Sequence, residues 1–322
     1  MKEILNFLAV TLTVLLFAGC PSEENEQADV EAKIFAEWAG CRSSPYGMEP
    51  FPSPSEWKTY VNKMASSYKK DENTSSTGTL VWIVGVVEDY ATVSCSLSFP
   101  KPKEGTVPDG LLFSRDDENE EYLSLFDEAG FSVWLQVEPG NVDIVELAKL
   151  VMNQYKNHKC VKGFGIDVEW YKNTKEGNPG TRLDDSVAQQ VDTAIKEINS
   201  TYSLFVKQWR TGYLPRTYRG VNNDMIFVTD SQQFYDLDDM TDQYKSWADN
   251  YAPNPVFFQI GYEGEKEDWD DPDEIGSDEK IWGKFKNPLK NFGQRILNEL
   301  EDNGQKRGII WVDFTFKKAY DM

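Results

Sequence analysis

Short apolar segments alternate with amphipathic helical segments along most of this chain, and this alternation constrains the fold more than any other feature. The apolar segments have the length and the residue types of buried strands. They span residues 79–87, 109–114, 131–138, 161–170, 202–209, 224–230, 255–262 and 308–314. The helical patterns span residues 53–68, 117–129, 142–156, 184–198, 236–248 and 287–302. Such an alternation predicts parallel βαβ units.

Eight predicted strands in a chain of 322 residues fit the strand number and the size of a (β/α)8 TIM barrel, an α/β fold. A doubly wound open sheet is the alternative, but the glycine-rich phosphate loop that follows its first strand is absent. We predict no cofactor. No linker interrupts residues 35–322, so we predict that they form a single barrel domain.

The N-terminus has the pattern of an export signal. Residues 1–19 combine an apolar run with small residues at its end, and they are too short for a membrane-spanning helix. The sequence LFAGC, Leu16 to Cys20, resembles the lipobox of bacterial lipoproteins, with Phe17 where an aliphatic residue is usual. The resemblance implies cleavage before Cys20, lipidation of its thiol and anchoring to a bacterial membrane, at the cell surface or in the periplasm. An ordinary cleaved signal is the alternative. Residues 20–34 are polar and acidic, and we predict a tether there.

The charge of the chain limits its partners. A net charge of −21 argues against a nucleic-acid partner and against a basic membrane-binding face. The acidic run 263–279 lacks the regular spacing of an EF-hand loop, which favours a solvated loop over a Ca²⁺ site. We predict no metal site.

Histidine and cysteine usage narrows the chemistry further. The single histidine, His158, excludes a zinc site with several His ligands, and its polar neighbours predict a surface position. No CxxC motif is present, so redox and zinc-ribbon functions are not indicated. In an oxidising compartment two of Cys41, Cys95 and Cys160 could pair. The sequence cannot choose the pair, and Cys41–Cys95 is a guess. Any acid–base chemistry therefore falls to carboxylates.

The segment VKGFGIDVEWY, residues 161–171, carries two such carboxylates. One set of alternate residues is large and apolar, as expected for the helix-facing side of a barrel strand: Phe164, Ile166, Val168 and Trp170. The other set would face the lumen: Gly163, Gly165, Asp167 and Glu169. Because carboxylates are costly in a dry core, Asp167 and Glu169 belong at the C-terminal mouth, where barrel active sites lie.

The spacing of Asp167 and Glu169 suggests acid catalysis. Residues i and i+2 lie roughly 6.6 Å apart along a strand, and two acids so close disfavour joint ionisation, which raises the pKa of one. A glutamic acid that is protonated near neutral pH can serve as a general acid. We predict Glu169 as that acid and Asp167 as its partner. The alternative is a pair of buried, hydrogen-bonded acids with a structural role.

Other strands also end in polar or aromatic residues, and these we predict to bind substrate. They are Gln136, Glu138, Trp209, Asp230, Gln259, Tyr262, Trp311 and Asp313. Trp311 and Asp313 alternate with apolar neighbours, so Trp311 is expected to form an apolar floor for a sugar ring.

The segment GFGIDVEWY resembles the signature DGxDxDxE on the fourth barrel strand of family 18 glycoside hydrolases, the chitinases and endo-β-N-acetylglucosaminidases. Glu169 falls on the catalytic acid of that family, and Asp167 on the aspartate that steers the substrate acetamido group. Lys162 and Gly165 occupy the positions of the two earlier acids.

Two further positions resemble the family. Asp230 falls near the aspartate that ends the sixth strand, with Thr229 in place of the usual tyrosine. Trp311 resembles the eighth-strand tryptophan that floors the sugar subsite.

The resemblance implies a cell-surface glycosidase that cleaves β-linked N-acetylhexosamine glycans by substrate-assisted retention, with Glu169 as acid. One alternative is a glycosidase of other specificity, in which Glu169 and Glu138 form a retaining pair with carboxyl groups about 5–5.5 Å apart. Lys162 and Gly165 favour another, a non-catalytic carbohydrate-binding lipoprotein on a degenerate barrel. A solute-binding or structural lipoprotein is the last alternative.

Overall fold

A computed structural model describes residues 28–87, 94–103, 105, 107–172, 180–230, 234, 236–262 and 281–322. The predicted signal, Cys20 and the acidic run 263–279 lie outside the described residues. Eight parallel strands form a closed barrel, because the first strand pairs with both the second and the last. The barrel strands are β1 (Trp38–Ser43), β2 (Thr77–Val87), β5 (Ser132–Val137), β6 (Val161–Asp167), β7 (Ser203–Lys207), β8 (Ile226–Asp230), β9 (Val256–Ile260) and β10 (Arg307–Val312). The predicted (β/α)8 barrel is confirmed.

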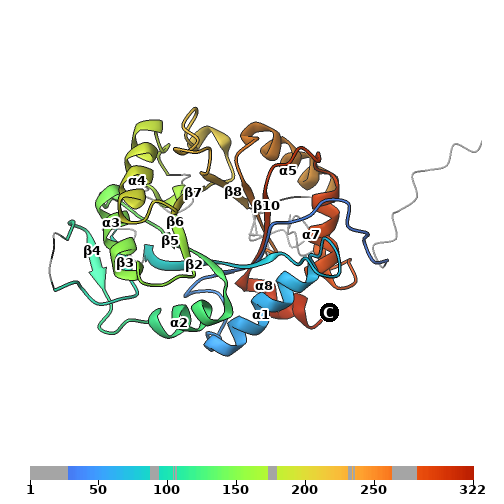
Figure 1. Cartoon of the computed structure of the whole chain (residues 1–322), viewed down its shortest axis with the longest axis horizontal. Coiled ribbons are helices and arrows are strands. Elements are labelled where there is room, and N and C mark those ends of the chain that lie inside the picture. The colour runs from blue at the N-terminus through green and yellow to red at the C-terminus, as the bar shows by residue number, and fades with distance from the viewer. Residues whose placement is uncertain are drawn as a thin grey trace, which may run out of the picture.

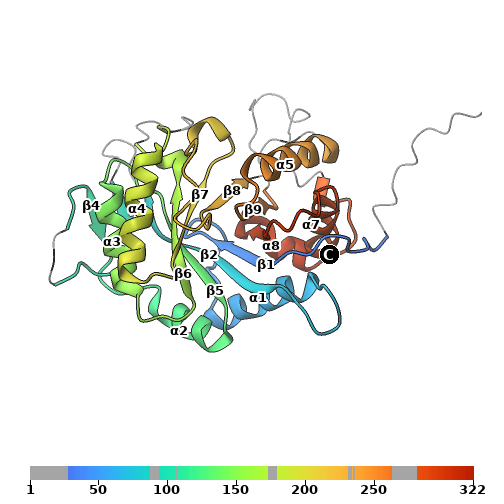
Figure 2. The ribbon, with the colours of Figure 1, turned by 45° about the horizontal axis from the view of Figure 1, so that its top comes forward.

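Helices cover most of the outside of the barrel, but the connection between β7 and β8 contains only the short 3₁₀ helix η2 (Thr211–Tyr213) (Figure 1, Figure 2). Those described are α1 (Pro54–Ser67), α2 (Glu120–Ala129), α3 (Ile144–Tyr155), α4 (Asp185–Ile198), α5 (Leu237–Tyr251), α7 (Pro288–Asn298) and α8 (Asp313–Tyr320). Local sequence sets several of their ends. Ser53 and Glu56 form a capping box at the start of α1, and Asp143 caps α3. Gly130, with φ of 70°, ends α2 in the left-handed conformation that favours glycine.

One predicted barrel strand lies outside the barrel, and the sequence analysis missed another, so the total of eight strands was still correct. Residues 109–114 contain only the short β4 (Leu111–Phe113), which pairs with β3 (Cys95–Leu97) outside the barrel. The first barrel strand is instead β1, whose sequence WAGCRS is too short and too polar to stand out. Strand β6 therefore remains the fourth strand of the barrel, as expected. The predicted strand 308–314 ends at Val312 because Asp313 begins α8.

Apolar side chains fill the middle of the barrel lumen. They are Val81, Trp134, Phe205, Ile226, Val228, Phe257 and Ile310. A second, larger core lies between strands and helices and includes Phe164 and Ile166, so the predicted orientation of β6 is confirmed. The lumen also explains the glycine face of this strand: a Cβ on Gly165 would lie 2.0 Å from the ring of Phe205. Glycine makes room for the aromatic side chains of neighbouring strands.

The remaining cysteines are not paired. Cys41, Cys95 and Cys160 are all buried free thiols, so the guessed Cys41–Cys95 disulfide was wrong. Cys41 and Cys95 pack among apolar side chains of the core, as free cysteines commonly do.

The segment before the barrel contacts a helix. Residues 30–34, at the end of the predicted tether, hydrogen-bond to Asn291, Gln294 and Asn298 of α7. Hydrogen bonds to the barrel domain therefore begin before residue 35, the predicted start of the domain. Among the described residues, no helix combines the length and the apolar character needed to cross a membrane.

Candidate active site at the C-terminal mouth of the barrel

A layer of polar side chains lies above the apolar plug of the lumen. Its members lie in the C-terminal parts of five strands or, for Glu138, directly after one. They are all buried: Arg42, Gln136, Glu138, Asp167, Lys207 and Gln259. Buried charges are costly unless they are paired or hydrogen-bonded. Such a layer at the C-terminal ends of parallel strands is where barrel enzymes place their reacting groups.

Asp167 and Glu169 share one cation, the side chain of Lys207. Lys207 Nζ lies 3.1 Å from Asp167 Oδ2 and 3.7 Å from Glu169 Oε2. Gln136 Nε2 donates a second hydrogen bond to Asp167 Oδ2, at 3.3 Å. The two predicted acids at the end of β6 thus form one cluster with Lys207 of the neighbouring strand β7.

Glu169 does not lie on the strand, as the sequence had suggested. Strand β6 ends at Asp167, and Val168–Trp170 form the short 3₁₀ helix η1. The turn carries Glu169 outwards, so its side chain is 23% exposed, whereas that of Asp167 is 1% exposed. A partly exposed carboxylate and a buried carboxylate are therefore only two residues apart in the sequence.

Lys207 was missed by the sequence analysis, although a signal was present. In strand β7 the alternate residues Ser203, Phe205 and Lys207 share a face, and Phe205 lies in the lumen plug. A lysine two residues after a lumen-facing residue must itself face the lumen. Its positive charge offsets the repulsion between the two acids that the sequence argument had emphasised.

Glu138 is held by two donors. The hydroxyl of Tyr46 donates to Glu138 Oε1 at 2.6 Å, and the backbone N–H of Val87 donates to Oε2 at 3.0 Å. Arg42 Nη2 in turn donates to the Tyr46 hydroxyl at 2.9 Å. Burial, together with the nearby charge of Asp167, raises the pKa of Glu138. Both oxygens are engaged, so Glu138 is a supporting group of the layer.

Asp313 joins the ends of the first and last barrel strands. As the first residue of α8, it accepts hydrogen bonds from the backbone N–H of Ser44 at 2.7 Å and from the Ser44 hydroxyl at 2.9 Å. Burial raises the pKa of Asp313 to about 6, although Arg42 and the Ser44 donors oppose the shift. Its carboxylate is committed to this junction.

Trp311 does not form a floor for a sugar ring, and this prediction was wrong. Its side chain is completely buried, and its indole N–H donates to Thr315 Oγ1 at 3.0 Å. Its ring packs against Trp282 and Phe292 in the core outside the strands. The neighbouring Ile310 faces the lumen instead. The error arose because Asp313 was counted as part of the strand, which reversed the assignment of its two faces.

The other predicted residues lie at the mouth. The hydroxyl of Tyr262 donates to Gln259 Oε1 at 3.1 Å, and both side chains are buried. Trp209 follows β7 and is partly exposed, with the guanidinium of Arg210 5.6 Å from its ring centre. Asp230 is the last residue of β8, as predicted.

Several buried polar atoms of the layer have no hydrogen-bond partner within the described part of the chain. Two are acceptors, Gln136 Oε1 and Asp167 Oδ1, and the donors are Gln259 Nε2 and Arg42 Nε and Nη1. A buried polar atom without a partner costs about 1–3 kcal/mol. The layer is therefore suited to bind further donors and acceptors, from water or from a ligand.

A separate cavity of about 330 Å³ lies beside the mouth, between β2 and α2. Phe51, Trp82 and Tyr122 line it, whereas Asp167 and Glu169 do not. We therefore do not assign the reaction to this cavity.

Comparison with known proteins gives structural similarities only. No family model matches the chain, and no curated protein matches it. A candidate alpha-L-fucosidase from Bacteroides thetaiotaomicron aligns over 94% of this chain and 96% of its own, with 12% identity and a TM-score of 0.48. A calcium-binding mutant of Bacteroides uniformis beta-glucuronidase 2 aligns over 87% of this chain and 31% of its own, with 12% identity and a TM-score of 0.45. A beta-glucuronidase from Parabacteroides merdae aligns over 88% and 33%, with 10% identity and a TM-score of 0.45. At these scores, we argue function from the side chains of the site.

Proposed function

We propose that the protein is a glycoside hydrolase that acts on β-linked N-acetylhexosamine glycans, with Glu169 as the general acid. The observation that carries the proposal is the cluster at the end of β6, where a partly exposed Glu169 stands above a buried Asp167 that is paired with Lys207. The resemblance of GFGIDVEWY to the family 18 signature supports the same two roles. We further propose that the chain is exported and anchored to a bacterial membrane through lipidated Cys20.

In the proposed mechanism the nucleophile belongs to the substrate. Glu169 gives its proton to the glycosidic oxygen, and the leaving sugar departs with that proton. The oxygen of the substrate N-acetyl group attacks the anomeric carbon and forms an oxazolinium ion. Asp167 supplies the negative charge that stabilises this cation, and Lys207 holds the Asp167 side chain in place. Water then opens the ring, and its proton returns to Glu169.

The unpartnered polar atoms of the layer support a sugar substrate. Sugar hydroxyl groups donate and accept hydrogen bonds at once, and Gln136, Asp167, Gln259 and Arg42 provide both kinds of partner. Ligand pockets commonly use a few such polar groups to fix orientation.

A specific observation favours a second candidate, a non-catalytic carbohydrate-binding protein. The family signature has an acid at the position of Gly165, where even a Cβ would meet the ring of Phe205 at 2.0 Å. An aspartate at this position would therefore require the lumen to be repacked. The chain therefore lacks the aspartate that assists the counterpart of Asp167 in the family. A barrel that binds glycans without cleaving them could keep Asp167 and Glu169 and lack this aspartate.

A substrate screen tests the proposal. The purified full-length protein is assayed with fluorogenic β-glycosides that carry either a 2-acetamido or a 2-hydroxyl group. We expect cleavage of the acetamido series only, since the 2-hydroxyl series lacks the nucleophile. Glu169→Gln should lower kcat by roughly 10²–10⁴-fold, and Asp167→Asn should also lower kcat. Glu197→Gln, at an exposed position on α4, serves as the matched control.

The possible results separate the candidates. Full activity in Glu169→Gln would reject Glu169 as the acid and direct attention to Glu138 or Asp313. Equal cleavage of both series would reject substrate assistance and favour a retaining pair of carboxylates. Glycan binding by calorimetry without any cleavage would favour the carbohydrate-binding candidate.

A further inference from the structure

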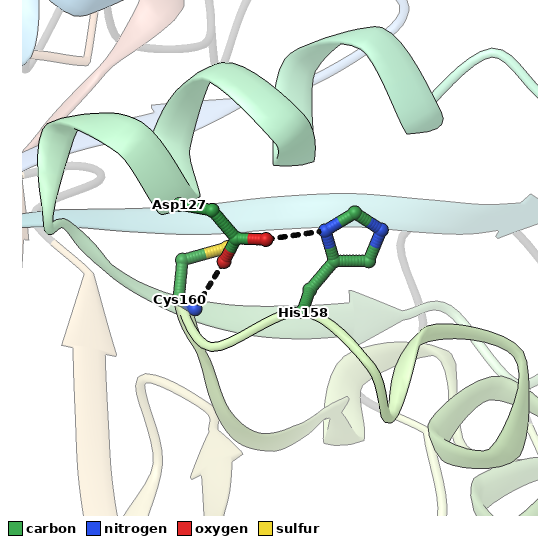
Figure 3. Close-up of side chains that lie close together, drawn as sticks. All are labelled: Asp127, His158 and Cys160. Carbon is green, nitrogen blue, oxygen red and sulfur yellow. Dashed lines mark hydrogen bonds and ion pairs between the residues drawn. The ribbon is translucent and has the colours of Figure 1, made fainter.

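A second cluster of ionisable side chains lies at the opposite end of β6, at the N-terminal face of the barrel (Figure 3). Asp127 extends from α2 towards the segment that precedes β6, which carries His158 and Cys160. His158 Nδ1 lies 2.9 Å from Asp127 Oδ2, and the backbone N–H of Cys160 donates to Asp127 Oδ1 at 2.6 Å. One ligand atom from each of the three side chains lies within 4.8 Å of the other two.

His158 is not a surface histidine, contrary to the expectation from sequence. Its side chain is only 11% exposed, and its second nitrogen, Nε2, lies 3.3 Å from Glu120 Oε2. The Asp127 carboxylate is 25% exposed, whereas Cys160 is buried. Burial raises the pKa of Asp127, but the Cys160 hydrogen bonds and His158 outweigh it and lower the pKa overall. An anionic oxygen, an imidazole and a thiol thus meet beneath a partly open surface.

We propose that Asp127, His158 and Cys160 form a binding site for Zn²⁺ or a similar borderline-soft divalent cation, with Glu120 or water as the fourth ligand. Zinc accepts this mixture of oxygen, nitrogen and sulfur donors at about 2.0–2.3 Å in a tetrahedral arrangement. Donor atoms around such an ion lie roughly 3.3–3.8 Å apart, so small side-chain rotations bring the three atoms to ligating positions.

A nucleophilic role for Cys160 does not fit the same geometry. Burial raises the pKa of the Cys160 thiol, and its Sγ contacts the backbone carbonyl of Leu123 at 3.5 Å. The second nitrogen of His158, Nε2, faces Glu120 rather than this sulfur. A buried thiol beside a carboxylate remains protonated and unreactive, whereas a bound cation would displace its proton to solvent.

The site would link two elements that are distant in sequence. Asp127 and Glu120 belong to α2, and His158 and Cys160 to the segment between α3 and β6. A metal ion held by both would fasten α2 to the base of the barrel. Its effect should therefore be on stability, with no direct effect on reactions at the C-terminal mouth.

Metal binding tests the proposal directly. The full-length protein is freed of metal with a chelator and titrated with ZnCl₂, and bound zinc is measured by calorimetry and elemental analysis. We expect His158→Gln and Cys160→Ser each to bind about one equivalent less zinc than the wild type. Cys95→Ser replaces another buried free cysteine and serves as the matched control. Circular dichroism establishes that each variant is folded.

Spectroscopy provides a second readout that does not depend on folding stability. Co²⁺ added to the metal-free protein should give a thiolate-to-metal charge-transfer band, which His158→Gln weakens and Cys160→Ser removes. Because His158 is the only histidine, zinc should also shift the single imidazole signal in the NMR spectrum. Equal zinc binding by the wild type and both variants, or an unshifted imidazole signal, would overturn the proposal and leave His158 as a hydrogen-bonding partner of Asp127.

Discussion

Near each end of strand β6 a carboxylate is paired with a basic side chain. The two pairs differ in how many of the carboxylate oxygens have hydrogen-bond partners in the protein. At the N-terminal end, both oxygens of Asp127 have partners, His158 and the Cys160 backbone. At the C-terminal end, Asp167 Oδ2 binds Lys207 and Gln136, but Oδ1 has no partner in the described part of the chain. The Asp127 carboxylate therefore has protein partners for both of its oxygens, whereas the Asp167 carboxylate keeps one oxygen that can accept a hydrogen bond from water or a ligand.

The two pairs also differ in burial. The Asp167–Lys207 pair is almost fully enclosed, with side chains 1% and 4% exposed. The Asp127–His158 pair is partly open to solvent. A buried pair is destabilising when it is broken, because one charge is left without a partner, whereas a partly exposed pair is rescued by water.

The largest effect should therefore come from breaking the buried pair. Lys207→Met leaves Asp167 in the layer without its cation, so the free energy of unfolding should fall by about 3–5 kcal/mol. Urea denaturation measures the change. Adding Asp167→Asn should recover part of the loss, because the uncompensated charge is then gone. Lys159→Met, an exposed lysine just before β6, is the control. A loss below about 1 kcal/mol would mean that Lys207 contributes no more than a surface ion pair.

A smaller effect should appear in the pH dependence of stability. The pKa of Asp313 is raised to about 6 by burial from an ordinary value of 3.8, so the folded state binds this proton more tightly than the unfolded state. Deprotonation of Asp313 should therefore lower the free energy of unfolding as the pH rises from about 4 to 6. The loss should reach up to roughly 3 kcal/mol, at about 1.4 kcal/mol per pH unit.

Asp127 should show the opposite sign. Its lowered pKa stabilises the fold above the unfolded pKa, and this contribution is lost as pH falls. Unfolding of wild type, Asp313→Asn and Asp127→Asn is compared from about pH 2 to pH 7, so that the range extends below the ordinary aspartate pKa as well as above it. Relative to wild type, Asp313→Asn should gain stability towards high pH and Asp127→Asn should lose it. Parallel curves for all three proteins would contradict the assigned shifts.

The smallest effect should follow from the partly exposed cluster in metal-free protein. Asp127→Asn weakens the bonds to His158 and Cys160, and we expect a loss of about 1–2 kcal/mol in the free energy of unfolding. Activity at the mouth should not change, because the barrel core separates the two ends. Glu128→Gln, the next and exposed residue of α2, is the control. A fall in kcat without a loss of stability would show that the two ends are coupled.

Strand β6 shows how much a local pattern predicts. Phe164 and Ile166 face the helices, and Gly165 and Asp167 face the lumen, as the alternation in the sequence indicated. Alternation of side chains is a property of a single strand, so no knowledge of its neighbours is needed. The barrel class follows in the same way from the order of strands and helices.

Strand β10 shows where the same reasoning fails. Its alternation is equally regular, but both faces are lined by large side chains, and Asp313 suggested the wrong face for Trp311. The polar residue belongs to α8, so only the position of the strand end decides which face is which. This strand end depends on tertiary contacts, namely the hydrogen bonds from Ser44 to Asp313.

The sequence by itself determined the barrel, the orientation of β6 and the position of Asp167 and Glu169 at the C-terminal mouth, because strand length and side-chain alternation are local properties. Only the tertiary structure decided which groups meet these acids. The register of β6 against β7 places Lys207 opposite Asp167, and closure of the barrel brings Arg42 of β1 into the same polar layer. Register and closure depend on every strand at once, so no single segment of the sequence contains them.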